Sequence, residues 1–583
     1  MTTPDDVEEP TGTILDELNI DGLWWPPDYL LMDTGLWHVT ETETTKGQRE
    51  HHICHWPMAI SRILTDTDDA SVYIEVAWHD GHRWKTLVLP REHAMMAGRL
   101  VAYARLGLPV DSTKSAKVTA YLSAFERANI SVIPTGRAAA RLGWHGDTFA
   151  WGHTALGDDE MVVSLPAGTE ELADGMKVAG DAAEWVEHVL TPVSAFPWVL
   201  AAVFASVAPL LVSMIREAEG FTFELAGITS GGKTTALSVA ASVWGAPSRI
   251  IGSWDATRVG VETRLAASGT LPVFLDDTAS INDPALVEQV LYDVTKGRTR
   301  ARGRADGGIR ATRSWQTVLL STGEEACVAL AGKGGARMRS VCLLGHPFER
   351  QDPETAKVVN TLRSAVHRFH GHLGPSVVQV LQGYDRDELE LRYRRYRDVW
   401  ASSCASPFAF RLGGHLAVLQ LAGEIIDEAE FPLGKSPHDV LQPVWRHVVD
   451  HLVDVDPSVR ALRRVYEWML ENEAAFYGRV GDGRCTWVGA WLEGETWTEV
   501  AILPRALERL LQPEHRLEPT LRAWAERGWL VRESERRLRR RTTVGNQRPR
   551  CVVILRAAFE EINEADAAAQ PNLRTLSGAL GGR

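Results

Sequence analysis

The eight residues from Gly227 to Thr234 have the types and spacing that hold a triphosphate, because they read GITSGGKT, a complete G-x-x-x-x-G-K-T pattern. Glycines at these places let the backbone curl until successive N–H groups point at phosphate oxygens. Lys233 supplies a positive charge near the outer phosphates, and the Thr234 hydroxyl can ligate Mg²⁺. We therefore expect ATP and Mg²⁺ as cofactors. The candidate phosphate-binding residues are Gly227, Thr229, Ser230, Gly231, Gly232, Lys233, Thr234 and Thr235.

A pair of carboxylates could complete the metal site. The apolar run Leu271–Leu275 is typical of a buried parallel strand, and Asp276 and Asp277 follow it directly. The end of this strand would emerge beside the glycine-rich loop. Asp276 is then the expected Mg²⁺-side acid, together with Thr234, and Asp277 is the candidate base that orients the attacking water. The alternative is a strand that ends in a solvated acidic turn.

A third strand, predicted over Trp315–Thr322, also ends in polar residues. In P-loop ATPases with an extra central strand, a polar side chain at this place bridges the metal-side acid and the γ-phosphate. We expect Thr322 to take this role here, with Ser321 as the second choice.

Two arginines, Arg337 and Arg339, precede a fourth predicted strand over Ser340–Leu344. An arginine in this position can reach the nucleotide of a neighbouring subunit and stabilise the charge of the transition state, which would imply a ring. We favour Arg339 over Arg337 for this role. The alternative is that both are surface arginines on a glycine-rich loop.

The elements around these residues predict an α/β domain. Residues 221–226 predict the strand that enters the glycine-rich loop, and residues 234–244 predict a helix whose N-terminus adds positive partial charge to the anion site. A further helix is predicted over 284–296, with Asp283 as its N-cap. Strand, loop and helix in this order predict a P-loop NTPase core over residues 156–350.

A basic segment lies between the acidic strand and the Trp315 strand. Four of its arginines recur with a period of two, so on a strand they would project from one face. Asp306-Gly307-Gly308 is a hairpin turn signal. In a protein with a net charge of −14, a face of this kind indicates a phosphate backbone as partner. The alternative is that the arginines pair with acids elsewhere in the chain. The candidate DNA-binding residues are Arg298, Arg300, Arg302, Arg304 and Arg310.

Three runs of sequence carry a resemblance to a known family: GITSGGKTTALSVAASVWGAP, SWDATRVGVETRLAASGTLPVFLDD and SWQTVLLSTGEE. With them the chain resembles the bacterial and phage family called domain of unknown function 927, which comprises P-loop ATPases carried by mobile elements and prophages. Some relatives look like self-loading replicative helicases with a hexameric ring of the AAA+ type. The resemblance is strongest over residues 220–350 and weaker over 36–152 and 408–426.

The resemblance implies roles for further residues. Thr257 and Glu262 belong to the signature of the family, and Arg411 stands where the family carries an arginine in its helical lid, a position that suits a sensor-2 group. The family commonly has Asp-Glu at the metal strand, whereas this chain has Asp276-Asp277. Aspartate is one methylene shorter and would hold the water less well. A paired Asp-Asp also resembles superfamily 3 helicases.

The remaining sequence predicts flanking domains around the α/β core. Short β-like runs separated by turns predict an α+β N-terminal domain, and helical periodicity after the core predicts a lid. The predicted parts are an acidic disordered tail over 1–25, the α+β domain over 26–155, the helical lid region over 351–480, a winged-helix-like domain over 481–560 and a flexible tail over 561–583.

The winged-helix-like prediction depends on the order of its elements. Helices are predicted over 504–511 and 516–527, followed by a strand over 529–532, a basic turn and a strand over 551–555. A basic wing beside a helix is a usual arrangement for binding duplex DNA. The alternative is a winged helix that binds protein and has a solvated basic loop. The candidate DNA-binding residues of the wing are Arg537, Arg540 and Arg541.

Composition limits the class and the location of the protein. The 583 residues contain only six scattered cysteines, which fits a reducing cytosol and argues against a disulfide scaffold or a structural zinc site. Residues 196–215 are almost wholly apolar and reach the roughly 20 residues of a membrane span. Pro197 and Pro209 interrupt them, so we expect a buried helix, no membrane contact and a cytoplasmic protein.

Two functional hypotheses follow from these features. The first is an ATP-driven DNA helicase or translocase of a phage or mobile genetic element. It would act in replication on single-stranded or forked DNA as a homo-oligomeric ring, with a hexamer favoured, and with a separate primase or replication partner. The second is a nucleotide-switched regulatory or defence ATPase that assembles without translocating DNA. A membrane-attached ATPase is a remote third option.

Overall fold

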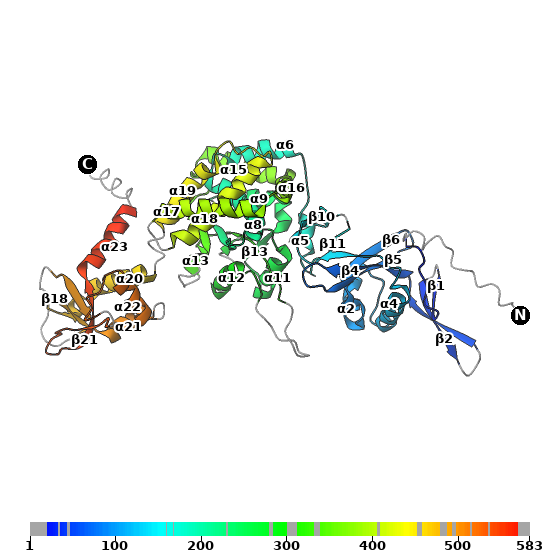
Figure 1. Ribbon diagram of the computed structural model, residues 1–583, viewed down its shortest axis with the longest axis horizontal. Coiled ribbons are helices and arrows are strands. Elements are labelled where there is room, and N and C mark those ends of the chain that lie inside the picture. The colour runs from blue at the N-terminus through cyan, green and yellow to red at the C-terminus, as the bar shows by residue number, and fades with distance from the viewer. Residues whose placement is uncertain are drawn as a thin grey trace.

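The computed structural model (Figure 1) has three parts that follow one another along its longest axis. An N-terminal α+β part leads into a central α/β part with its helical segment, and a small C-terminal part comes last. The structure describes residues 20–32, 35–42, 47–158, 160–166, 168–228, 231–278, 284–299, 312–330, 338–404, 408–451, 457–478, 487–492, 497–512, 516–534 and 537–569.

A five-stranded parallel sheet lies in the central part, with the strand order β13-β14-β15-β12-β16. Every residue of β12 and of β15 is buried, as expected for a parallel sheet that is covered on both faces. The mixed α/β fold with a parallel sheet is therefore confirmed. The strands are β12 (Thr222–Ala226), β13 (Ile251–Ser253), β14 (Val273–Asp276), β15 (Leu319–Gly323) and β16 (Ser340–Leu344).

The strand predicted from Trp315 starts later than expected, at Leu319. The backbone N–H of Trp315 donates to the carbonyl of Gly297 at 2.8 Å, and its indole N–H donates to the carbonyl of Asp293 at 3.1 Å. These bonds hold Trp315 against the end of helix α12, so its backbone is not available for the sheet. The helices that connect the strands are α9 (Lys233–Ser242), α10 (Pro247–Ile250), α11 (Arg258–Ser268), α12 (Pro284–Lys296) and α13 (Cys327–Leu330).

The long apolar segment forms helix α8 (Pro197–Met214), which contacts α9, α18 and α19. It is the one helix in the described part of the chain that is long and apolar enough to cross a membrane, and 83% of it is buried. Its one central polar side chain, Ser206, donates to the carbonyl of Ala240 at 2.7 Å. The expectation of a buried core helix agrees with this placement.

Among the described residues from 353 to 450, helices follow the parallel sheet without a strand between them. Antiparallel α17 and α18 pack side by side, and α15 packs against α9. This segment therefore touches both the apolar helix α8 and the helix that follows the glycine-rich loop. The helices are α15 (Pro353–Arg368), α16 (Leu373–Gln382), α17 (Arg386–Ser402), α18 (Ala409–Glu428) and α19 (Pro437–Asp450).

The N-terminal part has two sheets beside helix α4 (Ser115–Asn129). A five-stranded sheet has the order β11-β7-β4-β5-β6, a three-stranded sheet has the order β1-β2-β3, and a small sheet of β8 to β10 leads toward the central part. The strands are β1 (Tyr29–Met32), β2 (Gly35–Thr42), β3 (Gly47–Cys54), β4 (Met58–Asp66), β5 (Val72–His79), β6 (Trp84–Pro90), β7 (Thr135–Ala139), β8 (Gly143–His145), β9 (Thr148–Trp151), β10 (Thr154–Leu156) and β11 (Val162–Val163).

The C-terminal part has its own hydrophobic core, built by four helices and a sheet of order β17-β18-β19-β21-β20. The strand predicted over 529–532 is reduced to one bridge, between Leu530 and Ile554. The elements are α20 (Pro457–Glu471), β17 (Phe476–Tyr477), β18 (Gly489–Leu492), β19 (Glu499–Ile502), α21 (Pro504–Leu511), α22 (Leu517–Glu526), β20 (Arg540–Arg541), β21 (Arg550–Leu555) and α23 (Arg556–Ala569).

Candidate active site

The glycine-rich loop joins β12 to α9, and neighbouring residues leave no room for a side chain at two of its positions. Gly227 has φ 147° and Gly232 has φ 81°, both in the region that favours glycine. A Cβ at Gly232 would lie 2.7 Å from the Phe348 ring, and one at Gly227 would lie 2.8 Å from the carbonyl oxygen of Gly345. Both positions therefore require glycine. Thr229 and Ser230 lie outside the described residues.

Lys233 begins α9 and turns its side chain back over the loop. Its ammonium donates to the carbonyls of Gly227 and Ile228, each at 2.8 Å. Burial lowers the pKa of Lys233 from its usual value, while Glu324, Asp276 and Asp277 act in the opposite direction. The two carbonyl contacts hold the ammonium group at the mouth of the loop, where an entering anion would meet it.

The carboxylate of Asp276 receives two hydroxyl groups that come from two other elements. The hydroxyl of Thr234 donates to Asp276 Oδ1 at 3.3 Å, and the hydroxyl of Thr322 donates to the same oxygen. The parallel pairing of β14 with β15 brings these strand ends together. The arrangement gathers hard oxygen atoms of the kind that Mg²⁺ prefers. The structure thus brings together the predicted residues Thr234, Asp276 and Thr322.

Asp277 has a strained backbone beside this group. Its φ is 64°, in the left-handed region that aspartate enters more readily than most other residues. Its N–H donates to the hydroxyl of Thr322 at 3.2 Å. The turn directs the chain out of β14 immediately after Asp276, and Asp277 lines the same cavity as Lys233.

Ser321, the second choice for the bridging role, lies on the other side of its strand. Its hydroxyl accepts a hydrogen bond from the indole of Trp254 at 2.9 Å and is buried. Neighbouring residues of a strand point to opposite faces, so Thr322 faces the candidate site and Ser321 does not.

Arg339 lies at the amino end of β16, whereas the glycine-rich loop follows the carboxyl end of β12. The two strands pair in parallel from Thr222–Ser340 to Ala226–Leu344. Five residues at about 3.3 Å each separate the two ends by roughly 16 Å. The guanidinium of Arg339 lies over the Tyr292 ring, 4.6 Å from its centroid. Arg339 therefore cannot serve the loop of its own chain, and Arg337 is outside the described residues.

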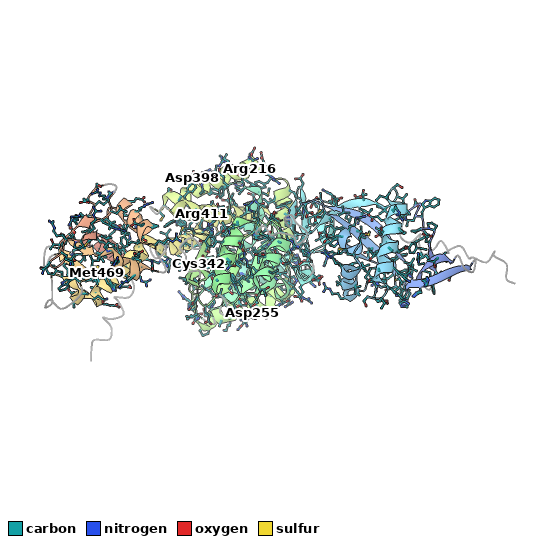
Figure 2. The ribbon with its side chains drawn as sticks, turned by 90° about the horizontal axis from the view of Figure 1, so that it is seen from below. Arg216, Asp255, Cys342, Asp398, Arg411 and Met469 are labelled. Carbon is teal, nitrogen blue, oxygen red and sulfur yellow. The ribbon has the colours of Figure 1, made fainter. Side chains whose placement is uncertain are left out.

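Arg411 of α18 lies in the central part (Figure 2), near the amino ends of the strands. It forms an ion pair with Glu219 at 2.6 Å, three residues before β12 begins. Burial, and after it the charge of Arg411, lowers the pKa of Arg339, which agrees with their proximity. Arg411 is thus at the same edge as Arg339, away from the loop of its own chain, and the sensor-2 interpretation does not fit this position.

A cavity of about 840 Å³ opens in front of the loop and contains residues that the sequence analysis missed. Asn360 and Arg363 of α15 line it, as do Arg350 and Glu324. Asp352 caps α15 by accepting from the N–H of Thr355 at 2.8 Å. An N-cap followed by proline is a helix start signal, and it could have revealed which residues of α15 share one face.

The family-signature residues Thr257 and Glu262 belong to a polar network that supports the site. Thr257 caps α11 by accepting from the N–H of Gly260 at 3.2 Å. The guanidinium of Arg258 contacts Glu262 at 2.8 Å and Asp293 of α12 at 3.0 Å. This network joins α11 to α12, which flank the acidic strand β14.

The basic segment is described only at its two ends. Arg298 pairs with Ser314 in an antiparallel bridge, and the N–H of Thr299 donates to the carbonyl of Arg313 at 2.9 Å. These pairs run antiparallel, as the hairpin prediction requires at its base. The predicted residues Arg300, Arg302, Arg304 and Arg310 lie outside the described residues.

The three arginines of the wing have different surroundings. Arg540 forms a partly buried ion pair with Glu499 at 2.5 Å, and Arg537 contacts Glu533 at 3.4 Å on the surface. Arg541, its neighbour on β20, is exposed. Arg537 and Arg541 are therefore both exposed, whereas Arg540 is partly buried.

Comparisons with known proteins agree with this architecture. Residues 29–314 match the family described as "Domain of unknown function (DUF927)", and residues 456–557 match the "Cch helix turn helix domain". No curated protein matches the sequence.

Two solved structures are similar to different degrees. The structure titled "SCCmec type IV Cch - active helicase" has a TM-score of 0.68 and 16% identity, and the match covers 93% of this chain and 99% of that one. At this identity the match shows a shared fold over nearly the whole length. The apo C-terminal region of NrS-1 has a TM-score of 0.26 and 10% identity, with 66% of this chain and 91% of that one covered, which establishes no common fold.

Proposed function

Since residues 29–314 of this chain belong to the family described as Domain of unknown function (DUF927), we propose that the protein is an ATP-driven DNA helicase or translocase of a phage or mobile genetic element. The observation that carries the proposal is the meeting of Thr234, Asp276 and Thr322 beside Lys233 in one cavity. These are the groups that a P-loop NTPase core uses to hold a nucleotide and its metal ion.

The residues present fit ATP with Mg²⁺. Gly227, Gly231, Gly232 and Thr235 would cradle the phosphates with the loop, together with Thr229 and Ser230. Thr234 and Asp276 would hold Mg²⁺, which would neutralise phosphate charge when bound. Lys233 would contact the outer phosphates, and its two carbonyl partners keep it within reach of them.

Hydrolysis requires a positioned water beside the terminal phosphate. Asp277 would accept the proton of that water, and it lines the same cavity as Asp276. Thr322 would orient Asp276 through their hydrogen bond and donate toward the terminal phosphate as the nucleotide enters. This assigns acid–base, metal-holding and sensing roles to three neighbouring side chains.

DNA is the proposed partner for two reasons. The C-terminal part matches a helix-turn-helix family, and helices α21 and α22 supply the two helices of such a motif. The basic segment starts at Arg298, between α12 and β15, so its base is attached to elements on both sides of the candidate site. Arg298, Arg300, Arg302, Arg304 and Arg310 would follow a single strand, and Arg537, Arg540 and Arg541 would contact a duplex.

A ring is proposed from the position of Arg339. It lies at the opposite end of the sheet from its own loop, so any nucleotide that it contacts would belong to a neighbouring copy. Copies that repeat this head-to-tail contact close into a ring, and a hexamer is favoured. Arg337 remains the second choice for the same role. A separate primase or replication partner would complete the replication function.

The competing function is a nucleotide-switched regulatory or defence ATPase that assembles without moving DNA. The observation that favours it is the short carboxylate of Asp277, whose backbone is already strained. Slow hydrolysis that DNA does not change, together with stable assembly, would support this function instead.

The test is ATP hydrolysis with and without single-stranded and forked DNA, with the oligomer mass measured in the same buffer. We expect DNA to stimulate hydrolysis and forked DNA to be unwound. Lys233→Ala should abolish both activities, whereas Lys357→Ala, which removes an exposed lysine of α15 outside the cavity, should retain them. Hydrolysis by Lys233→Ala at the parental rate would contradict the site.

A further inference from the structure

We propose that Arg363 of α15, assisted by Arg350, binds the phosphates of the nucleotide held by the same chain. The inference rests on the proposed function and adds residues that neither the loop pattern nor the family resemblance indicates. Both arginines line the 840 Å³ cavity that opens in front of Lys233 and Thr234.

The charge of the cavity requires cations besides Lys233. Four carboxylates line it, and Lys233, Arg350 and Arg363 are the only cationic side chains among the described residues that do so. A metal-bound triphosphate still carries net negative charge. Lys233 alone would leave this charge opposite an excess of carboxylates, so the two arginines have an electrostatic role that no other lining residue can take. The four carboxylates are Asp276, Asp277, Glu324 and Asp352.

Arg350 and Arg363 are both exposed, and no ion pair or side-chain hydrogen bond joins either of them to another described residue. Two arginines of α17 behave differently, since Arg394 and Arg397 both pair with Glu217. Two guanidinium groups in one cavity that make no hydrogen bond or ion pair to a described residue suit an anionic ligand, which a planar guanidinium can contact with two N–H groups.

Helix α15 holds Arg363 in a defined place. Ala356, Asn360 and Arg363 are spaced by four and three residues, so they share one face, and all three line the cavity. The helix begins at the Asp352 cap and packs against α9, the helix that starts at Lys233. Arg363 is therefore fixed relative to the loop by direct helix packing within one chain.

Arg363 and Arg339 would thus serve different nucleotides. Arg363 faces the cavity at the carboxyl ends of the strands, and Arg339 lies near their amino ends. One chain would contribute Arg363 to its own site and Arg339 to the next copy. Because α15 begins the helical segment, a phosphate contact at Arg363 also connects nucleotide binding to that segment.

The first test compares nucleotide binding by Arg363→Ala, Arg350→Ala and the control Lys357→Ala, which removes a cation from the same helix outside the cavity. We expect Arg363→Ala to weaken binding of a fluorescent ATP analogue about tenfold or more, as loss of a charge-assisted hydrogen bond does. Binding of the corresponding monophosphate should change much less. Arg363→Lys should recover part of the loss. Equal affinities of Arg363→Ala and Lys357→Ala would overturn the proposal.

The second test asks which chain Arg363 serves. Chains carrying Lys233→Ala are mixed with chains carrying Arg363→Ala, and hydrolysis is measured after subunit exchange. If Arg363 serves its own chain, every site lacks one of the two groups and mixing restores nothing. Recovery of activity would overturn the assignment to the same chain. Lys233→Ala measured alone distinguishes failure of the proposed nucleotide site from failure of the role of Arg363. Nucleotide binding by that variant at the parental affinity would contradict the nucleotide site itself.

Discussion

The hydroxyl of Thr322 donates a hydrogen bond to the carboxylate of Asp276, 46 residues earlier in the chain. The two residues end neighbouring parallel strands, and the Thr234 hydroxyl reaches the same carboxylate oxygen from the start of α9. One oxygen atom of Asp276 thus links strand β14, strand β15 and the end of the glycine-rich loop. Variants of the residues around this oxygen atom therefore test the candidate site.

Thr322→Val should lower kcat for ATP hydrolysis about 10- to 100-fold, with a smaller change in KM, because the donor toward the terminal phosphate is lost while the volume is kept. Thr322→Ser should retain most of the activity. Steady-state kinetics of both variants check this. A Thr322→Val enzyme with parental kcat would exclude Thr322 from the chemical step.

Asp277→Asn should bind ATP as the parent does and hydrolyse it about 100-fold more slowly or worse, since the amide cannot accept the proton of the water. Asparagine also tolerates the positive φ of this position, so the fold should be preserved. Binding of a fluorescent analogue and single-turnover hydrolysis separate the two effects. Unchanged hydrolysis would show that another group is the base.

Arg339→Ala should be inactive alone and regain activity when mixed with Lys233→Ala chains. In a mixed ring, roughly a quarter of the head-to-tail contacts would combine an intact loop with an intact Arg339. The measurement is ATPase activity against the mixing ratio. The contrast with Arg363→Ala, which should gain nothing from mixing, is the internal control. Failure of Arg339→Ala to recover would remove it from the neighbouring site.

Replacing Arg298, Arg300, Arg302 and Arg304 together with alanine should abolish the stimulation of ATP hydrolysis by single-stranded DNA, because the contacts to the phosphate backbone are lost. Hydrolysis without DNA is the reference in the same preparation. Stimulation in the parent should also decline as salt rises. Stimulation of the fourfold variant to the parental level would exclude the segment from DNA binding.

Arg258→Ala should destabilise the central part by about 2–4 kcal/mol, because the buried carboxylates of Glu262 and Asp293 both lose their ion pair with Arg258. Thermal unfolding of the purified protein measures the change. Arg556→Ala, which breaks an exposed pair with Glu560, is the matched control and should cost less than about 1 kcal/mol. Equal effects of the two variants would mean that the network contributes little.

Four of the five strands of the central sheet and the glycine-rich loop could be predicted because each depends on local sequence, whereas the short strand β13 was missed. The loop needs glycine at Gly227 and Gly232, and a buried parallel strand needs a continuous apolar run such as the one before Asp276. The strand over Ser340–Leu344 has the bounds expected from its pattern. The match to the family model could also be anticipated, since two of the three short runs quoted for the resemblance lie within residues 29–314.

Features that depend on distant contacts could not be predicted. The backbone of Trp315 has strand-like neighbours in sequence, but its hydrogen bonds to the end of α12 remove it from the sheet. The position of Arg411 was inferred from resemblance, and its pairing with Glu219 is a contact across 192 residues. The cavity-facing side of α15 is likewise set by its packing on α9.

The burial of α8 has a consequence for biosynthesis. Two of the helices that cover it, α18 and α19, begin at Ala409 and Pro437, about 200 residues after α8 ends at Met214. At about 5–20 residues per second, a ribosome needs on the order of 10–40 s to supply them. During that interval the nascent chain carries an apolar segment that α18 and α19 do not yet cover, so we expect chaperones to bind it before these helices are made.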